Sequence, residues 1–512
     1  MTSNKWRIIL FLAALGSSAV LFSSMPISEL DSGWCHNVIR NWDSVGFFKL
    51  GGQLVTNPGG VLPDSPLDIY SGHRPYSLIF PFVIGKIAGG FGSDGVAFYL
   101  VLSAAVALAA KHLLGNRAAA WLGGLLVLMC PGYVRMTVGL DTLTLPVLLG
   151  LPFLAPVCRR LHEPRPIGLG MAALMALTVA TYAVLNWTTA FVFPIVGLYL
   201  IAQMGLFNRR FVLFTLTATV ATVAVALVSI ASKAGGGGSG GFALFYNSYL
   251  WGGGGYGGFP MNWKTAIVRL SVASLLGLLP LLVFSGWVLV RCRKAGRLVP
   301  KSFLPVAGAL ASVVGMRNYF AHHPWMASSV LIVGIVFSLA LMLPQLEAGP
   351  AEPGYRELLW VLGAAAYCYL IVATFNVNSA DADRLITLVK QHTPRNGIII
   401  LSKTVDTSGF HQVQRFNDEF DRTVILPEDG QARESGGLES APTFFLSNEK
   451  VPALGEPVAQ TLDRKNLLTG AISAGLDWYR THISKRSATD RLSLSETYYL
   501  YVYAPAAPGH TP

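Results

Sequence analysis

The chain has 512 residues, of which 52% are hydrophobic and 13% are charged, and its formal net charge is +11. This composition excludes an ordinary soluble protein, because apolar runs of membrane-crossing length recur along most of the chain. The lysines and arginines gather beside these runs, so the basic balance indicates membrane topology and not nucleic-acid binding.

The apolar runs predict an α-helical polytopic membrane protein with about eleven transmembrane helices. The first run also fits a secretory signal peptide, whose cleavage would leave the remaining topology unchanged. Five scattered cysteines give no disulfide framework. In chain order the predicted spans are 6–22, 95–114, 118–134, 143–158, 167–185, 189–206, 211–232, 270–290, 303–316, 326–343 and 358–375.

Lysines and arginines occur on alternate connections between these spans. Basic residues near span ends stay in the cytoplasm during insertion, so the amino terminus is predicted to be cytoplasmic and the long loops external. An odd number of spans then exports the carboxyl-terminal region. The residues that set this pattern are Lys5, Arg7, Lys111, Arg117, Arg159, Arg160, Arg165, Arg209, Arg210, Arg291, Arg293, Lys294, Arg297 and Lys301.

The first external loop, residues 25–93, begins with two acids, Glu29 and Asp31. Acids at the mouth of a membrane bundle are costly and are therefore candidates for chemistry. Asp31 can also cap a helix in which Trp34, Val38 and Trp42 form an apolar stripe, which we expect to lie along the membrane surface.

The same loop ends in a polar stretch that holds His73 and Arg74, followed by the apolar segment 76–87, which is short for a span. A second long loop, 233–265, has two glycine runs separated by aromatic residues. It fits either a substrate-gating loop or a linker with interfacial aromatics.

Polarity rises after residue 375, and the tail shows a short helix and several strands. We predict a transmembrane domain over 1–375 and a small extracytoplasmic α/β domain over 376–512. The tail shows no phosphate-binding loop or hydrolase motif, which favours a role in stability or substrate selection over catalysis. The predicted elements are a helix at 381–392 and strands at 397–402, 422–426, 443–446 and 497–503.

Two short external turns carry further polar residues. Asp141 opens the fourth span, where it is either a helix cap or a chemical group. Arg317, His322 and His323 precede the tenth span, and Trp325 beside them fits an interface anchor. Adjacent histidine side chains diverge and no third ligand is fixed by spacing, so a metal site at His322 and His323 stays open without being indicated.

The first-loop acid, the amphipathic helix behind it, the Pro-x-Asp-x-Tyr-x-x-His-Arg-Pro stretch from Pro66 to Pro75, and the acid at the fourth span resemble the GT-C superfamily of membrane glycosyltransferases. Similar layouts occur in protein O-mannosyltransferases, lipid A aminoarabinose transferases and related bacterial enzymes that use polyprenyl-phosphate sugars. Many members carry Asp-Glu in the first loop. Here the matching pair is Asp31-Ser32, with Glu29 upstream.

The resemblance implies a glycosyltransferase of the bacterial inner membrane, with a periplasmic tail and sugar transfer by inversion. Asp31 is the expected base, and Glu29 and Asp141 are the other expected catalytic acids. Arg74 and Arg317 are expected to hold the departing phosphate, because guanidinium matches phosphate oxygens. Tyr70, His73 and Lys264 complete the expected substrate site.

The implied partners are a polyprenyl-phosphate-linked sugar, the lipid bilayer and an unidentified lipid, glycan or protein acceptor, with no nucleic acid. A donor with a single phosphate requires no cofactor, although a divalent metal stays open. Two alternatives remain: an envelope polysaccharide polymerase or ligase, and a transporter or flippase for lipid-linked sugars. Transporters usually place charges near the membrane midplane, whereas nearly all charges here lie outside the predicted spans.

Overall fold

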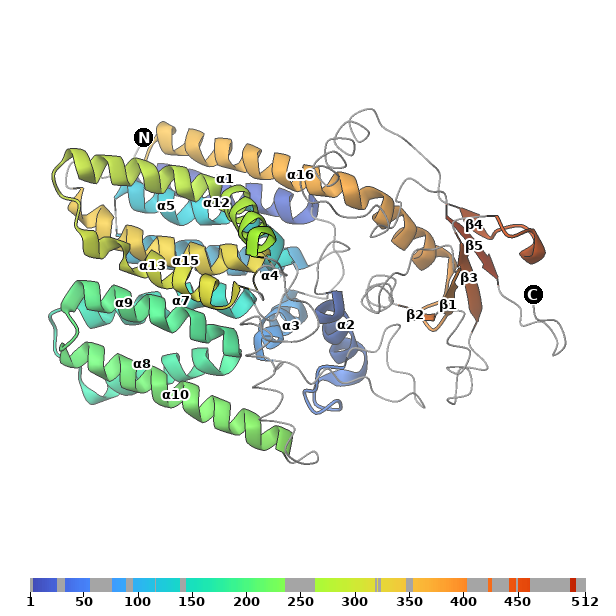
Figure 1. Cartoon of the computed structure of the whole chain (residues 1–512), viewed down its shortest axis with the longest axis horizontal. Coiled ribbons are helices and arrows are strands. Elements are labelled where there is room, and N and C mark those ends of the chain that lie inside the picture. Colours follow the sequence, from blue (N-terminus) through green and yellow to red (C-terminus); the bar gives the residue numbers. More distant parts are fainter. Residues whose placement is uncertain are drawn as a thin grey trace. The chain divides into compact units, whose positions relative to one another are not determined.

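The computed structural model divides the chain into two compact units (Figure 1). We call Met1–Ser23 with His73–Val372 the helical unit, and Ser24–Gly72 with Ala373–Pro512 the mixed unit. The structure describes residues 3–24, 33–55, 76–88, 95–115, 117–138, 144–234, 263–317, 320, 324–346, 353–402, 422–425, 442–447, 450–460 and 498–502.

A helix occurs at each of the eleven predicted spans. Lipid offers no hydrogen-bond partners, so the backbone N–H and C=O groups of each apolar run must bond to one another within a helix. By length and composition, α1, α4, α12, α15 and α16 can each cross a membrane, and the bent pair α8 and α9 would count as a sixth span among the described residues. The number eleven therefore stays a prediction. The α-helices are α1 (Ser3–Ser24), α3 (Tyr76–Ala88), α4 (Gly95–Leu114), α5 (Ala118–Leu128), α6 (Pro131–Val138), α7 (Thr144–His162), α8 (Leu169–Leu185), α9 (Val192–Met204), α10 (Arg209–Ala234), α12 (Trp263–Lys294), α13 (Leu304–Gly315), α15 (Pro324–Met342) and α16 (Tyr355–His392).

Helix α15 forms the centre of the helical unit. All of its residues from Met326 to Met342 are buried, whereas the apolar window of α16 is only 17% buried. α15 packs against α4, α6, α7, α9, α12 and α13. Small residues allow the closest of these approaches, because a glycine lets two helix backbones come together. At Gly334, an added β-carbon would lie 2.5 Å from the β-carbon of Ala309 in α13.

One predicted span is interrupted, and a sharp bend lies between two others. The span predicted at 118–134 is divided into α5 and α6 around Met129 and Cys130, immediately before Pro131, which has no backbone N–H. Between α8 and α9 the chain bends by 119°. There the backbone of Asn186 is extended, its side-chain oxygen accepts a hydrogen bond from the Thr188 N–H, and the 3₁₀-helix η3 (Trp187–Phe191) follows.

The basic connections of the helical unit gather at one end, which we call the basic end. Lys111 at the end of α4 lies within electrostatic reach of Arg7 and Arg159, which belong to α1 and α7. Arginines also join separate connections there through backbone carbonyls, and this gathering is the arrangement that the alternating charges predict. These bonds run from Arg117 to Leu346 (3.1 Å), Arg297 to Gln345 (3.0 Å), Arg159 to His112 (3.0 Å) and Arg210 to Leu161 (2.8 Å).

The mixed unit begins with α2 (Gly33–Asn41), which continues into the π-helix η2 (Trp42–Gly46). The helix is where the sequence predicts it, but the expected membrane-surface stripe is wrong for Val38 and Trp42, both fully buried. The chain folds back over this face: Asn41 donates a side-chain bond to the Val55 carbonyl (2.9 Å), and the Trp42 indole donates to the Gln53 carbonyl (2.7 Å). Trp34 lies in α2, but its side chain is outside the described part.

The described part of the mixed unit also contains a five-stranded sheet in the order β2-β1-β3-β5-β4. β1 is parallel to β2 and β3, whereas β5 is antiparallel to β3 and β4. The four predicted strands are confirmed within a residue or two, and β4 was not predicted. The strands are β1 (Ile398–Leu401), β2 (Thr423–Ile425), β3 (Thr443–Ser447), β4 (Ala459–Gln460) and β5 (Tyr499–Val502).

The predicted helix at 381–392 is not a separate element. It is the last part of α16, which runs unbroken from Tyr355 to His392 because no glycine or proline interrupts the sequence after Gly363. Its residues Leu385 and Val389 pack against Ile399, Phe444 and other buried side chains of the sheet.

Candidate functional site

Most of the predicted site residues lie outside the part of the chain that the structure describes. Arg317 and Lys264 are the two that are described, and both belong to the helical unit. Their placement therefore defines where the candidate site can be examined. The site residues outside the described ranges are Glu29, Asp31, Tyr70, His73, Arg74, Asp141, His322 and His323.

Arg317 lies where α13 ends. Met316 is the C-cap of this helix, and the Arg317 side chain is half-buried. Just beyond it, Phe320 is fully buried, with its ring centroid 5.3 Å from that of Phe191 in η3. This ring contact holds the turn after α13 against the bend between α8 and α9. Lys264, at the start of α12, is exposed.

These elements share the end of the helical unit opposite the basic end. Four helices begin at the basic connections, namely α5, α8, α10 and α13, and each runs away from them. The elements that follow α5 and α8, which are α6 and η3, and the last turn of α13 therefore lie at the other end. α15 begins there, at Pro324, and returns toward the basic end, where Gln345 accepts the bond from Arg297. We call this the hydroxyl end, after the side chains buried there.

Among the buried hydroxyl groups that have no hydrogen-bond partner within the described atoms, three lie on η3 and α15 at the hydroxyl end. They belong to Thr188 of η3 and to Ser328 and Ser329 in the second turn of α15, all fully buried. An unpaired hydroxyl in an apolar interior costs about 1–3 kcal/mol, so such groups are usually satisfied by water or a ligand. Chemically, they can donate to an anionic or sugar oxygen.

Close packing surrounds Ser328. An added β-carbon on Gly132 of α6 would lie 2.7 Å from the β-carbon of Ser328 and 3.4 Å from the Gly277 carbonyl of α12. Three helices therefore meet around Ser328. Next to Gly132 in α6, Tyr133 shares a hydrogen bond of 3.0 Å with Ser103 of α4, and Thr137, one turn further on, donates to the Tyr133 carbonyl.

Sequence reasoning missed Thr188, Ser328 and Ser329. A signal for the serines was present, because Ser328-Ser329 is an adjacent polar pair inside the apolar segment 326–343. Polar groups within such segments tend to face the bundle interior. No comparable signal marks Thr188, which becomes buried through the bend at Asn186.

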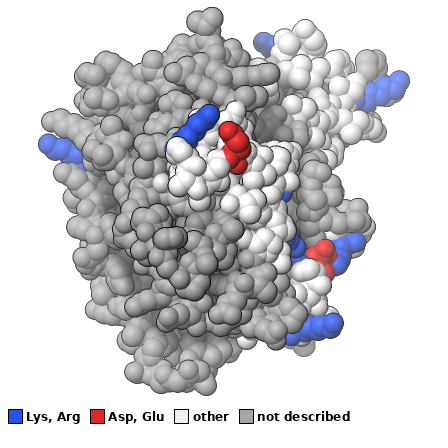
Figure 2. Space-filling view, turned by 90° about the vertical axis from the view of Figure 1, so that its right-hand side faces the viewer, with Lys and Arg blue, Asp and Glu red and all other residues white. Residues whose placement is uncertain are grey.

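The described side chains on the face in Figure 2 are mostly uncharged, and basic ones lie singly or beside acidic ones. A nucleic-acid interface would show a continuous basic patch, which the described part of this face does not carry. Among the described residues, no three histidine, cysteine, aspartate or glutamate side chains form a group suited to a metal ion.

Comparison with solved structures gives a match to ArnT from Cupriavidus metallidurans bound to undecaprenyl phosphate. The TM-score is 0.56 and the sequence identity is 11%, over 99% of this chain and 100% of that chain. The chain thus has the fold of ArnT, a GT-C protein, which confirms at the level of fold the resemblance seen in the sequence. No protein-family model matches the sequence, and no curated protein matches it.

Proposed function

We propose that this protein is an integral membrane glycosyltransferase that moves a sugar from a polyprenyl-phosphate donor to an extracytoplasmic acceptor. The observation that carries the proposal is the ArnT fold over nearly the whole chain, since that structure holds undecaprenyl phosphate, a lipid of the required class. A shared fold alone does not determine activity. The proposal therefore also depends on the polar groups at the hydroxyl end.

In the proposed reaction, an acceptor oxygen or nitrogen attacks the anomeric carbon of the donor sugar. The bond between that carbon and the phosphate oxygen breaks, and its electron pair leaves with the phosphate. Asp31 takes the proton from the acceptor, with Glu29 as the alternative base and Asp141 as the group that orients the acceptor. Attack from the face opposite the phosphate inverts the anomeric centre.

Negative charge grows on the phosphate as the sugar departs, and cations placed there stabilise the transition state. Arg74 and Arg317 are the proposed cations, with Lys264, His73 and Tyr70 as further contacts to the donor. The half-buried position of Arg317 supports this role, because a guanidinium partly removed from water attracts a phosphate more strongly than an exposed one. Ser328 and Ser329 are proposed to donate hydrogen bonds to the donor headgroup.

The products of the reaction test this proposal in the cell. Envelope lipids, glycans and exported proteins would be compared by mass spectrometry in strains with the wild-type chain, without it, and with Asp31→Asn. We expect one sugar modification to disappear in the second and third strains and its polyprenyl-phosphate donor to accumulate. An unchanged set of glycans in the strain without the protein would refute the proposal.

A further inference from the structure

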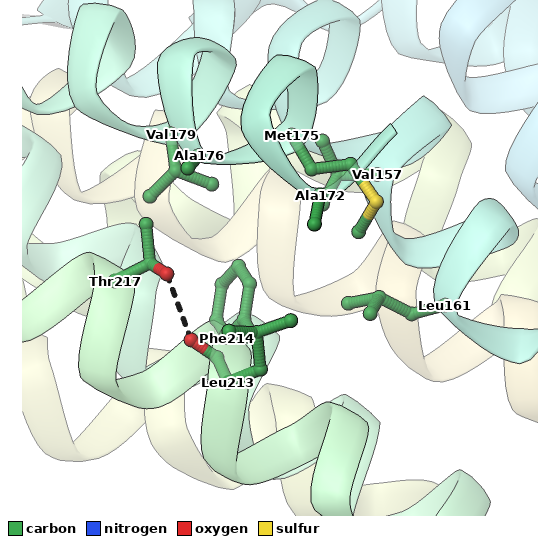
Figure 3. Close-up of a pocket in the computed structure, with 9 residues that line it drawn as sticks. All are labelled: Val157, Leu161, Ala172, Met175, Ala176, Val179, Leu213, Phe214 and Thr217. Atoms are coloured by element: carbon green, nitrogen blue, oxygen red, sulfur yellow. Dashed lines mark hydrogen bonds between the residues drawn. The ribbon is translucent and has the colours of Figure 1, made fainter. Parts of the chain in front are cut away.

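A groove opens between α7, α8 and α10, at the part of the helical unit nearest the basic end (Figure 3). The groove is shallow, since its enclosed volume is only about 10 Å³, so an occupant would lie along it and stay open to the surroundings. The floor is buried and apolar, formed by Leu161, Met175 and Phe214, while Leu213 at the lip is 43% exposed. The lining includes one polar side chain, that of Thr217. Its hydroxyl donates a hydrogen bond to the Leu213 carbonyl (2.8 Å), so the groove stays apolar.

Basic residues surround the mouth of this groove. Arg209 lies one helical turn before Leu213, on the same face of α10, and its side chain is exposed. Arg210 donates hydrogen bonds to the carbonyls of Leu161 (2.8 Å) and Arg165 (2.9 Å), which holds the end of α7 and the segment after it beside the start of α10. The Arg165 backbone is therefore held beside the start of α10, which carries Arg209, and the Arg165 side chain is also exposed.

The local charge is strongly positive. The segments 159–165 and 209–210 contain five arginines and one acid, Glu163. That acid is already paired with Arg160, at 2.5 Å. An anion at the mouth would thus meet an excess of guanidinium groups, which bind phosphate oxygens in a two-pronged geometry.

We infer that this groove binds one acyl chain of an acidic phospholipid, whose phosphate lies between Arg165 and Arg209. The lining of α8 extends from Ala172 to Val179, about 10 Å along the helix, which suits part of an acyl chain. The outer faces of α8 and α10 favour a lipid over a protein partner, because they expose apolar side chains. Among these are Leu174, Leu177, Leu216 and Val220. This site is separate from the hydroxyl end and does not depend on the proposed function.

The test is a binding titration of the purified full-length protein by native mass spectrometry. The probes are phosphatidylglycerol and phosphatidylcholine with identical acyl chains, and inorganic phosphate alone. We expect phosphatidylglycerol to bind about tenfold more tightly than phosphatidylcholine, because its net charge is negative. The variant Arg165→Gln/Arg209→Gln should lose this preference, while Arg293→Gln/Lys294→Gln, two exposed cations of α12, should keep it.

A second pair of variants tests the groove itself. Ala176→Phe fills the groove and should weaken the binding of both lipids, whereas Ala173→Phe, on the exposed face of the same helix, should not. Three results would overturn the inference: a lipid preference that survives Arg165→Gln/Arg209→Gln, wild-type lipid binding by Ala176→Phe, or competition by inorganic phosphate as effective as that by phosphatidylglycerol. The arginine variant keeps the test decisive if Ala176→Phe does not fold.

Discussion

Gly132 of α6 and Ser328 of α15 are so close that a β-carbon on Gly132 would lie 2.7 Å from the β-carbon of Ser328. This approach places the Ser328 hydroxyl in the interior at the hydroxyl end. Any side chain at position 132 would force α6 away from α15 and would move the polar groups that we assign to the donor site.

Gly132→Ala should therefore destabilise the protein by about 1–3 kcal/mol, the usual cost of an overpacked contact. Thermal unfolding in detergent would show this as a lower midpoint. Gly197→Ala is the matched control, since no atom lies within 4 Å of a β-carbon there. Adding Ser328→Gly to Gly132→Ala removes the clash, so the double variant should recover part of the loss. Additive losses would mean that the two residues do not compete for space.

Arg422 joins β2 to the end of α16, and we expect its removal to loosen the mixed unit. It is buried and donates hydrogen bonds to the Thr393 carbonyl (2.8 Å) and hydroxyl (3.0 Å), satisfying groups at a helix C-terminus. Arg422→Ala should cost about 2–3 kcal/mol and expose the tail to limited proteolysis. The exposed Arg395→Ala should leave the cleavage pattern unchanged. If Arg422→Ala and Arg395→Ala resisted proteolysis equally, Arg422 would not hold β2 to the end of α16.

The orientation of the chain is a separate prediction. The basic connections gather at one end of the helical unit, and such residues normally stay in the cytoplasm. A reporter fused after Ser402 should therefore be active only in an external, oxidising compartment, and one fused after Gly296, between α12 and α13, only in the cytoplasm. A cytoplasmic signal after Ser402 would reverse the orientation and every external-site assignment.

The sequence predicted the helices well because long apolar runs leave a membrane chain few alternatives. It did not reveal how α15 becomes the central helix, since its apolar composition resembles that of the lipid-facing helices. The burial of Trp42 and the union of 381–392 with the last span also depend on tertiary contacts. Periodicity finds an apolar face but does not identify what covers it.

The site was predicted only in part, for a related reason. Charged residues near span ends are conspicuous in such a sequence, so Arg317 can be proposed from the sequence alone, and its role stays a prediction. Hydroxyl groups are common in apolar segments and usually cost little free energy there. Thr188 and Ser328 become notable only because the packing removes water from them. Their unpaired state is a property of the folded chain and has no counterpart in local sequence.

Arg317→Lys tests the proposed phosphate contact. Lysine keeps the charge but loses the two-pronged geometry, so turnover should fall about tenfold or more with a smaller change in donor binding. Arg74→Lys should behave in the same way. Arg293→Lys, an exposed residue at the basic end, should retain wild-type turnover. Unchanged kcat in both Arg317→Lys and Arg74→Lys would remove these arginines from the site.

The central claim is transfer from a polyprenyl-phosphate sugar, and it is measured most directly with purified protein. The protein in nanodiscs would receive labelled undecaprenyl-phosphate sugars and an envelope acceptor extract, and free undecaprenyl phosphate and labelled product would be quantified together. We predict equal amounts of both from the wild-type chain, a decrease of about a hundredfold or more with Asp31→Asn, and near-wild-type transfer with Asp43→Asn, an exposed acid of η2. Movement of intact donor across the bilayer without release of undecaprenyl phosphate would contradict the account and indicate a flippase.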